Sequence, residues 1–161
     1  MNERTIQQYL MSEVLNGKNH VAAVPNSQYL LLTEADLLSV TRAHLVHEFE
    51  IKCSVSDYNR DFKSKVWKHM VLKSQGAMRS RRGRCPNYFW FVTYDFDIEP
   101  PEYAGWIKAV PRPYDSTILA LQYKKQAPRL HENKWDDAQV AKIARLLSFR
   151  LLGEWRRYAN V

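Results

Sequence analysis

The chain has 161 residues, of which 45% are hydrophobic, 12% aromatic and 25% charged, and this composition excludes a disordered chain and fits one folded domain. A formal charge of +7 and a pI near 9.5 favour a polyanionic partner, with nucleic acid ahead of an anionic membrane surface. No apolar stretch approaches the roughly 20 residues of a membrane span, so we expect a cytosolic protein. Cys53 and Cys85 have no CxxC partner, which predicts reduced thiols and argues against a disulfide framework or a zinc site.

Apolar periodicity and turn residues predict helices and strands along the whole chain. The helices are expected over residues 5–16, 56–73 and 136–158. The strands are expected over residues 21–24, 29–41, 45–53, 88–94, 106–110 and 117–124. The order helix, strands, helix, strands, helix predicts one α/β or α+β domain spanning residues 1–161, with helices covering a mixed sheet.

Acidic and basic residues alternate along two of the expected central strands. If these strands form a hairpin with its turn centred on Ala43, Asp36 stands opposite Glu50 and Glu34 opposite Lys52. Directly opposed residues have β-carbons about 4.5–5.5 Å apart, so the two carboxylates of Asp36 and Glu50 could share one cation. Lys52 would emerge on the same face, two residues beyond Glu50.

Two such carboxylates repel each other unless a proton, a basic group or a metal ion lies between them. Mg²⁺ commonly uses one or two protein carboxylates and takes its other ligands from water and substrate phosphate. Lys52 could then position the attacking water and stabilise charge on the phosphorus centre. The alternative is a solvated strand face whose charges pair across the hairpin.

Glu13 lies among Ile6, Leu10 and Val14 on a helical wheel of the first helix, inside the apolar stripe. Burial of a carboxylate there is costly, and a metal site over the neighbouring strands would compensate for it. In the alternative interpretation, Glu13 reaches solvent at a frayed last turn or pairs with a lysine.

The run EADLLSVTRAHLVHEFEIKCSVSDYNRDF resembles the PD-(D/E)xK nuclease superfamily, and within it the MmcB-like DNA-repair proteins of bacteria and phages. The later stretches PNYFWFV, PEYAGWI and KKQAPRLH are also similar to that group, so the resemblance covers most of the chain from Glu34 onward. It implies a restriction-endonuclease-like mixed sheet flanked by helices, in a bacterial cell or a phage-infected host. Some members of the superfamily act as dimers, so a homodimer is one candidate form.

The resemblance also implies roles for particular residues. Asp36 takes the first acidic position, Glu50 the second and Lys52 the lysine, while Glu13 fits the helical glutamate of many members. Ala35 replaces the usual proline, a change that the superfamily tolerates. We therefore expect an Mg²⁺- or Mn²⁺-dependent endonuclease that leaves a 5′-phosphate and acts in DNA repair, recombination or phage DNA processing. The rival interpretation is a non-catalytic DNA-binding or repair-accessory protein with the same fold.

Basic residues elsewhere are candidates for contacts with the DNA backbone. They are Lys65 and Lys68 on the second helix, Arg81, Arg82 and Arg84 in an arginine-rich loop, and Lys124 at the end of a strand. Each has a structural alternative: a solvated helix face, a loop that is disordered without DNA, and an edge strand protected by lysines. Asp57 and Asp61 could reach the site, but a structural role is favoured, in which they cap the helix and pair with Lys65. The aromatic run from Tyr88 to Phe91 could stack on bases, but it is expected in the core.

Overall fold

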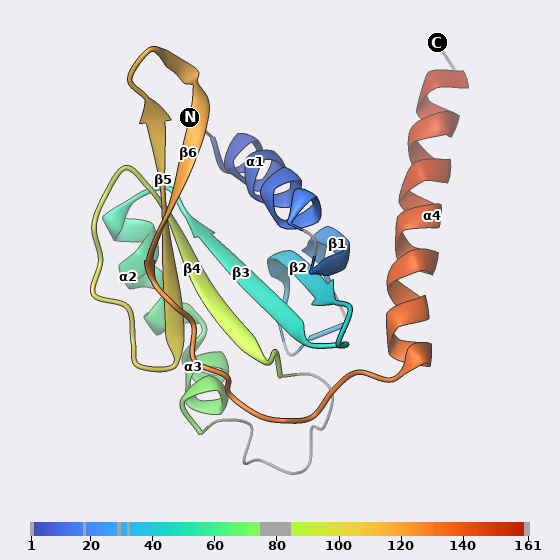
Figure 1. The fold of residues 1–161 in the computed structure, drawn as a ribbon, viewed down its shortest axis with the longest axis horizontal. Helices are drawn as coiled ribbons and strands as arrows, with labels where there is room; N and C mark the ends of the chain where they lie inside the picture. Colours follow the sequence, from blue (N-terminus) through green and yellow to red (C-terminus); the bar gives the residue numbers. More distant parts are fainter. Residues whose placement is uncertain (1, 18, 29, 32, 75–84, 160–161) are drawn as a thin grey trace.

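The structure is a computed structural model, and it describes residues 2–159 except 18, 29, 32 and 75–84. Its helices are α1 (Glu3–Asn16), α2 (Val55–Ser64), α3 (Val66–Lys73) and α4 (Asp137–Ala159). Its strands are β1 (His20–Ser27), β2 (Ala35–Thr41), β3 (Val46–Lys52), β4 (Tyr88–Tyr94), β5 (Ala104–Arg112) and β6 (Asp115–Lys125). The prediction of a mixed sheet flanked by helices is confirmed (Figure 1).

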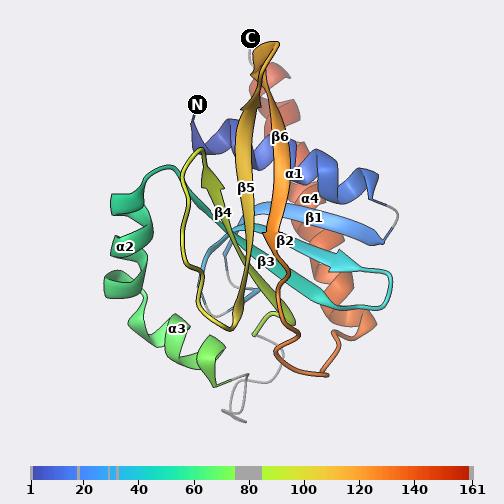
Figure 2. The same cartoon turned by 60° about the vertical axis from the view of Figure 1, so that its left-hand side comes forward.

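The six strands lie in sequence order in one sheet, β1-β2-β3-β4-β5-β6. Strands β3, β4 and β5 are parallel neighbours, and the remaining neighbours are antiparallel. The two parallel steps need crossover connections, which the segment containing α2 and α3 supplies between β3 and β4. Figure 2 shows α2 and α3 together beside the sheet, where they bring the residues that follow Lys52 back over β3.

The helices cover both faces of the sheet, and each face has its own apolar cluster. Helix α1 packs Ile6, Leu10 and Val14 onto one face, against side chains that include Phe49 and Trp90. The other face has two further clusters, one formed with α2 and α3 and one formed with α4 and the segment just before it. Helix α4 lies beside the edge strand β1 (Figure 1). Within the described residues, no helix is long and apolar enough to cross a membrane.

Three predicted boundaries are wrong, each for a local reason. Strand β1 continues through Pro25, because β1 is an edge strand in which a missing N–H is tolerated. The strand predicted over 29–41 begins only at Ala35, and Leu31 ahead of it packs into the core without belonging to a strand. The helix predicted over 56–73 is broken at Lys65, whose φ of −116° and ψ of 36° end α2 and let α3 start in a new direction.

Candidate functional site

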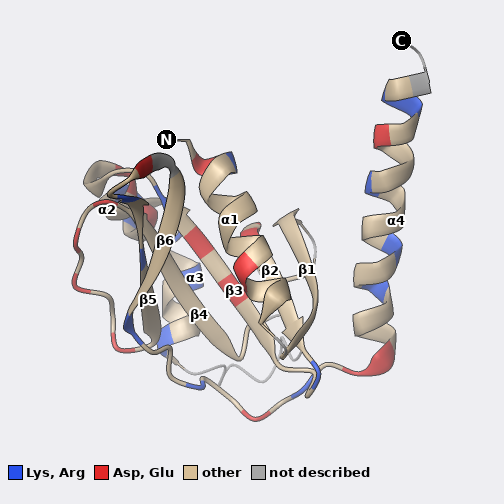
Figure 3. Cartoon of the chain, turned by 45° about the horizontal axis from the view of Figure 1, so that its top comes forward, with Lys and Arg blue, Asp and Glu red and all other residues tan. Residues whose placement is uncertain are grey.

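The hairpin of β2 and β3 has the predicted register. Leu37 pairs with Phe49, and Leu38 pairs with Glu48, so the turn is centred on Ala43 as expected. His44 adopts a φ of 61° in this turn. Because side chains alternate along β3, Phe49 faces α1 whereas Glu48, Glu50 and Lys52 face α2 and α3. Figure 3 shows the acidic positions of β3 near the middle of the sheet.

The site consists of buried charges from β3, α2 and α3, which we call the acid–lysine cluster. Its members are Glu48, Glu50, Lys52, Asp61, Lys65 and Lys68, and Asp36 lies next to it on β2. Glu48, Glu50, Lys52, Asp61 and Lys68 are each 5% exposed or less. Buried charges are tolerated when they are paired and hydrogen-bonded, and each carboxylate of the cluster has a lysine partner. The exception in hydrogen bonding is Oε1 of Glu48, which lies 2.5 Å from Lys68 without the geometry of a hydrogen bond.

Glu50 is the centre of the cluster. Its Oε1 atom accepts hydrogen bonds from Lys52, at 3.0 Å, and from Lys65, and its Oε2 atom accepts one from Lys68 at 2.7 Å. Burial alone would raise the pKa of Glu50, but the positive charges of Lys68 and Lys52 outweigh it and lower that pKa. Glu50 is therefore ionised at neutral pH.

Lys52 is held between two carboxylates. Its Nζ atom donates to Glu50 and also to Oδ1 of Asp61, at 2.7 Å. Asp61 in turn lies 2.8 Å from Nε2 of His69, and Nδ1 of His69 lies 2.9 Å from the hydroxyl oxygen of Tyr103. This chain of contacts fixes the position of the Lys52 ammonium group, as support around a functional group should.

Asp36 has a different environment from Glu50. Its Oδ2 atom accepts a hydrogen bond of 2.6 Å from the backbone N–H of Ile51, and no lysine bonds to it among the described residues. Burial raises its pKa, and so do the negative charges of Glu50 and Glu3, against the opposing effect of the Ile51 N–H and Lys65. The result is a pKa of about 7, because the protein compensates the negative charge of an ionised Asp36 only in part.

This imbalance gives a first testable prediction. The ordinary pKa of Asp36 is 3.8, and its pKa in the folded state is about 7. At pH values between the two, the folded state holds a proton on Asp36 that the unfolded state releases, so the free energy of unfolding falls as pH rises through this range. The Asp36→Asn variant removes the charge and keeps an acceptor for the Ile51 N–H. We expect it to be more stable than the wild type at pH 8 without divalent metal, on the order of 1–3 kcal/mol after allowance for solvent screening, with a much smaller difference at pH 4. Urea unfolding at both pH values measures this; a destabilised variant at pH 8 would contradict it.

The prediction that Glu13 belongs to this site is wrong. Glu13 is exposed, and it borders a pocket with Phe49 and Trp90 on the α1 side of the sheet, opposite the side of Glu50 and Lys52. The polar residue that α1 buries is Gln7, whose Nε2 atom donates to the backbone oxygen of Asp36 at 2.5 Å. The glutamate of α1 whose charge affects Asp36 is Glu3.

The predicted DNA-binding residues have varied environments. The prediction that Lys68 contacts DNA is wrong, because Lys68 is only 2% exposed. It lies 2.5 Å from Glu48 and also bonds to Glu50. Lys65 is partly exposed and forms the predicted pair with Asp61 at 3.2 Å. Lys124 is exposed on the edge strand β6. Arg81, Arg82 and Arg84 lie outside the described residues.

The residues next to the cluster have ordinary structural roles. Ser54, not Asp57, caps α2 by accepting a hydrogen bond from the backbone N–H of Asp57, and Asp57 pairs with Arg60 and not with Lys65. Phe89, Trp90 and Phe91 are buried in the core, as an aromatic run at strand spacing predicts.

No group of three or more His, Cys, Asp or Glu side chains is arranged to hold a metal ion within the described part of the chain. The candidate ligands are therefore the pair Asp36 and Glu50.

The fold and the site thus define a class of protein. It is an α+β domain with a buried acid–lysine cluster beside an uncompensated aspartate. No known family model matches the chain, and no curated protein matches it. Among solved structures, the fold is similar to that of a protein of unknown function from Silicibacter pomeroyi. The TM-score is 0.56 at 16% identity, over 92% of this chain and 84% of that chain, so the likeness concerns the fold alone.

Proposed function

We propose that the protein is an Mg²⁺- or Mn²⁺-dependent deoxyribonuclease that hydrolyses phosphodiester bonds at Asp36, Glu50 and Lys52. The observation that carries the proposal is the pair of carboxylates from adjacent strands, with Asp36 uncompensated and Lys52 held beside Glu50 on the same face. Their spacing agrees with the resemblance to PD-(D/E)xK nucleases, and the basic charge of the chain suits a DNA substrate.

The donor set fits a divalent cation. Asp36 and Glu50 provide hard carboxylate oxygens, and the raised pKa of Asp36 reflects the repulsion that a cation would relieve. Glu3, in the first turn of α1, is the helical glutamate whose charge raises the pKa of Asp36, and it takes the role predicted for Glu13. When bound, the ion would polarise the phosphate and lower the pKa of a coordinated water.

Lys52 and Lys65 have different roles in the proposed reaction. Lys52 is fixed by Glu50 and Asp61, so its ammonium group is already positioned to orient a water and to stabilise negative charge that develops on the phosphate. Lys65 has 30% of its side chain exposed, against 6% for Lys52 and 2% for Lys68. Lys65 is therefore the partner of Glu50 that can leave most easily and move to a DNA phosphate.

One observation favours the rival function, a DNA-binding protein without catalysis. The three lysines around Glu50 already neutralise it, so this carboxylate is stable without a metal ion. Such a protein would bind DNA through exposed basic side chains and would not cleave it.

A single assay distinguishes the two functions. Purified protein is incubated with single-stranded, duplex and branched DNA, each with Mg²⁺, with Mn²⁺ and with EDTA, and both binding and cleavage are recorded. We expect metal-dependent cleavage of at least one substrate, giving 5′-phosphate ends. Salt-sensitive binding to every substrate without cleavage in any metal would support the rival function, because phosphate contacts alone give binding that weakens steeply with salt.

A further inference from the structure

Lys65 differs from the other lysines of the acid–lysine cluster in how it reaches Glu50. It is the residue at which α2 ends and α3 begins, and its backbone N–H donates to the backbone oxygen of Asp61 at 2.8 Å. From this break its side chain extends to the cluster, where Nζ donates to Oε1 of Glu50 and lies 3.2 Å from Oδ1 of Asp61. Lys65 thus enters the cluster from its edge, between two helices.

The ammonium group of Lys65 lies at a position suited to a cation shared by Asp36 and Glu50. It bonds to Glu50 directly. Burial raises the pKa of Asp36, and the positive charge of Lys65 opposes this rise, so that charge acts on β2 as well as on β3. A divalent cation held by both carboxylates would therefore compete with the Lys65 ammonium group for the same place.

Lys65 is also the lysine of the cluster that solvent reaches most easily. Its side chain is 30% exposed, against 6% for Lys52 and 2% for Lys68. An ammonium group is strongly hydrated in water, so Lys65 can exchange its contact with Glu50 for water without passing through the core. The deeper burial of Lys52 and Lys68 keeps these two lysines in the cluster.

The formal charges of the site favour this exchange. The cluster and its neighbour on β2 have three lysines and four carboxylates, Lys52, Lys65 and Lys68 against Asp36, Glu48, Glu50 and Asp61. When all four carboxylates are ionised, one negative charge is left over among these groups. Replacement of the Lys65 ammonium group by a divalent ion removes that charge, whereas a monovalent ion would leave it unchanged.

We propose that Lys65 competes with the divalent cation for its site: without metal the Lys65 ammonium group occupies the cation position, and metal binding at Asp36 and Glu50 expels it. The inference rests on the proposed function, because it requires a metal ion at these two carboxylates. Lys65 then sets the affinity of the site and its preference for divalent over monovalent cations. Once expelled, its side chain is free to contact a DNA phosphate.

Mn²⁺ binding by the full-length protein tests the competition. Free Mn²⁺ is followed by its electron paramagnetic resonance signal for the wild type, Lys65→Met and Lys63→Met. We expect Lys65→Met to bind Mn²⁺ at least about tenfold more tightly, because the ion no longer has to displace a charge-assisted hydrogen bond. Lys63 is exposed on α2, so Lys63→Met should change the affinity less than about twofold and measures the general effect of losing one positive charge.

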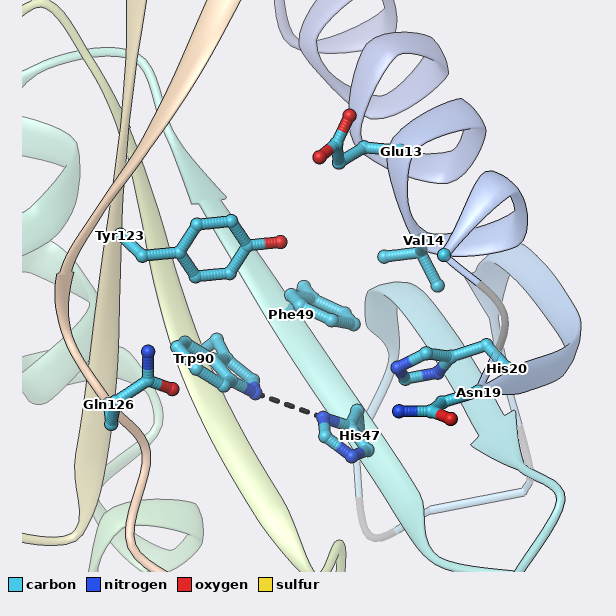
Figure 4. A pocket seen from close by; sticks show the side chains of 10 residues that line it. Glu13, Val14, Asn19, His20, His47, Phe49, Trp90, Tyr123 and Gln126 are labelled. Atoms are coloured by element: carbon cyan, nitrogen blue, oxygen red, sulfur yellow. Dashed lines mark hydrogen bonds between the residues drawn. The ribbon is translucent and has the colours of Figure 1, made fainter.

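Two further variants show whether the ion is bound at the proposed carboxylates. Asp36→Asn, alone and combined with Lys65→Met, should weaken Mn²⁺ binding about tenfold or more, because it removes one of the two ligands. Glu13→Gln is the matched control for the loss of a carboxylate. Glu13 lies beside Val14 and Tyr123 over a pocket on the opposite face of the sheet (Figure 4), so its replacement should leave the affinity unchanged.

Chemical labelling shows whether the Lys65 side chain moves. Lysines of the wild type are acetylated with limiting reagent, with Mg²⁺ or with K⁺ at equal ionic strength, and quantified by mass spectrometry. We expect Mg²⁺ to raise the labelling rate of Lys65 severalfold relative to that of Lys63 in the same sample, and K⁺ to have no such effect. This measurement uses the wild type alone, so it does not depend on the folding of a variant.

The outcomes separate this inference from the proposed function. Tighter, Asp36-dependent Mn²⁺ binding by Lys65→Met, together with faster labelling of Lys65 in Mg²⁺, supports the inference. Asp36-dependent binding with equal affinities for Lys65→Met and the wild type, or a labelling rate of Lys65 that Mg²⁺ does not change, would overturn it and leave the proposed metal site standing. Absence of Asp36-dependent binding in both proteins would overturn the metal site and the inference together.

Discussion

Replacing Lys52 with alanine should reduce the rate of metal-dependent DNA cleavage about 10²–10³-fold, the usual cost of removing one preorganised donor. Lys52 and Lys65 both contact Glu50 and Asp61, but Lys52 is the more buried of the two, with 6% of its side chain exposed against 30% for Lys65, and it bonds to Asp61 at 2.7 Å. The change should lower the maximal rate and leave DNA binding nearly unchanged, since Lys52 is 5% exposed.

Lys63→Ala is the matched control for this prediction. Lys63 is an exposed lysine on α2, so its loss should leave the cleavage rate within about twofold of the wild type and should slightly weaken DNA binding. Single-turnover cleavage and a binding isotherm on the same substrate measure both quantities. Equal cleavage rates for Lys52→Ala and the wild type would remove Lys52 from the mechanism.

Replacing Lys68 with methionine should lower the free energy of unfolding by about 3–5 kcal/mol, because it leaves the buried carboxylate of Glu48 without its cation. Lys68 is among the largest fully buried side chains, and it bonds to Glu50 and lies against Glu48. Burial alone would lower the pKa of Lys68, but Glu48 and Glu50 outweigh it and raise that pKa.

The double variant Glu48→Leu/Lys68→Met shows whether the loss comes from unpaired charge. Burial raises the pKa of Glu48, so its replacement removes a costly carboxylate together with its partner, and we expect at least half of the lost stability to return. Urea denaturation measures all variants, with Lys63→Met as an exposed control expected within about 0.5 kcal/mol of the wild type. A Lys68→Met variant as stable as that control would contradict the ion-pair account.

The hairpin register was predictable because it depends on local sequence alone. The turn at residues 42–44 and the alternation along both strands fix which side chains oppose one another, so Glu48, Glu50 and Lys52 face the same side as predicted. The role of Lys68 was not predictable in the same way. Its burial depends on the break at Lys65, which turns α3 so that Lys68 points at β3.

The error at Glu13 arose from the width of the helical stripe. Glu13 is next to Val14 on the wheel, but the face of α1 that packs on the sheet contains Ile6, Gln7, Leu10 and Val14. Glu3 precedes Gln7 by one helical turn and Leu10 by two, so the same periodicity extended to the N-terminus would have indicated Glu3. The hydrogen bond from Trp90 to His47 had no comparable signal, because it joins two strands that are distant in sequence.

The measurement that tests the central claim most directly is a time course of cleavage of one end-labelled DNA, with enzyme in excess, for the wild type and for Glu50→Gln. The glutamine keeps the shape of the side chain and removes its charge, and circular dichroism confirms that both proteins are folded. The proposed function predicts 5′-phosphate products from the wild type with Mn²⁺, none with EDTA, and a rate at least about 10²-fold lower for Glu50→Gln. Equal cleavage by the two proteins, or cleavage that continues in EDTA, would contradict it.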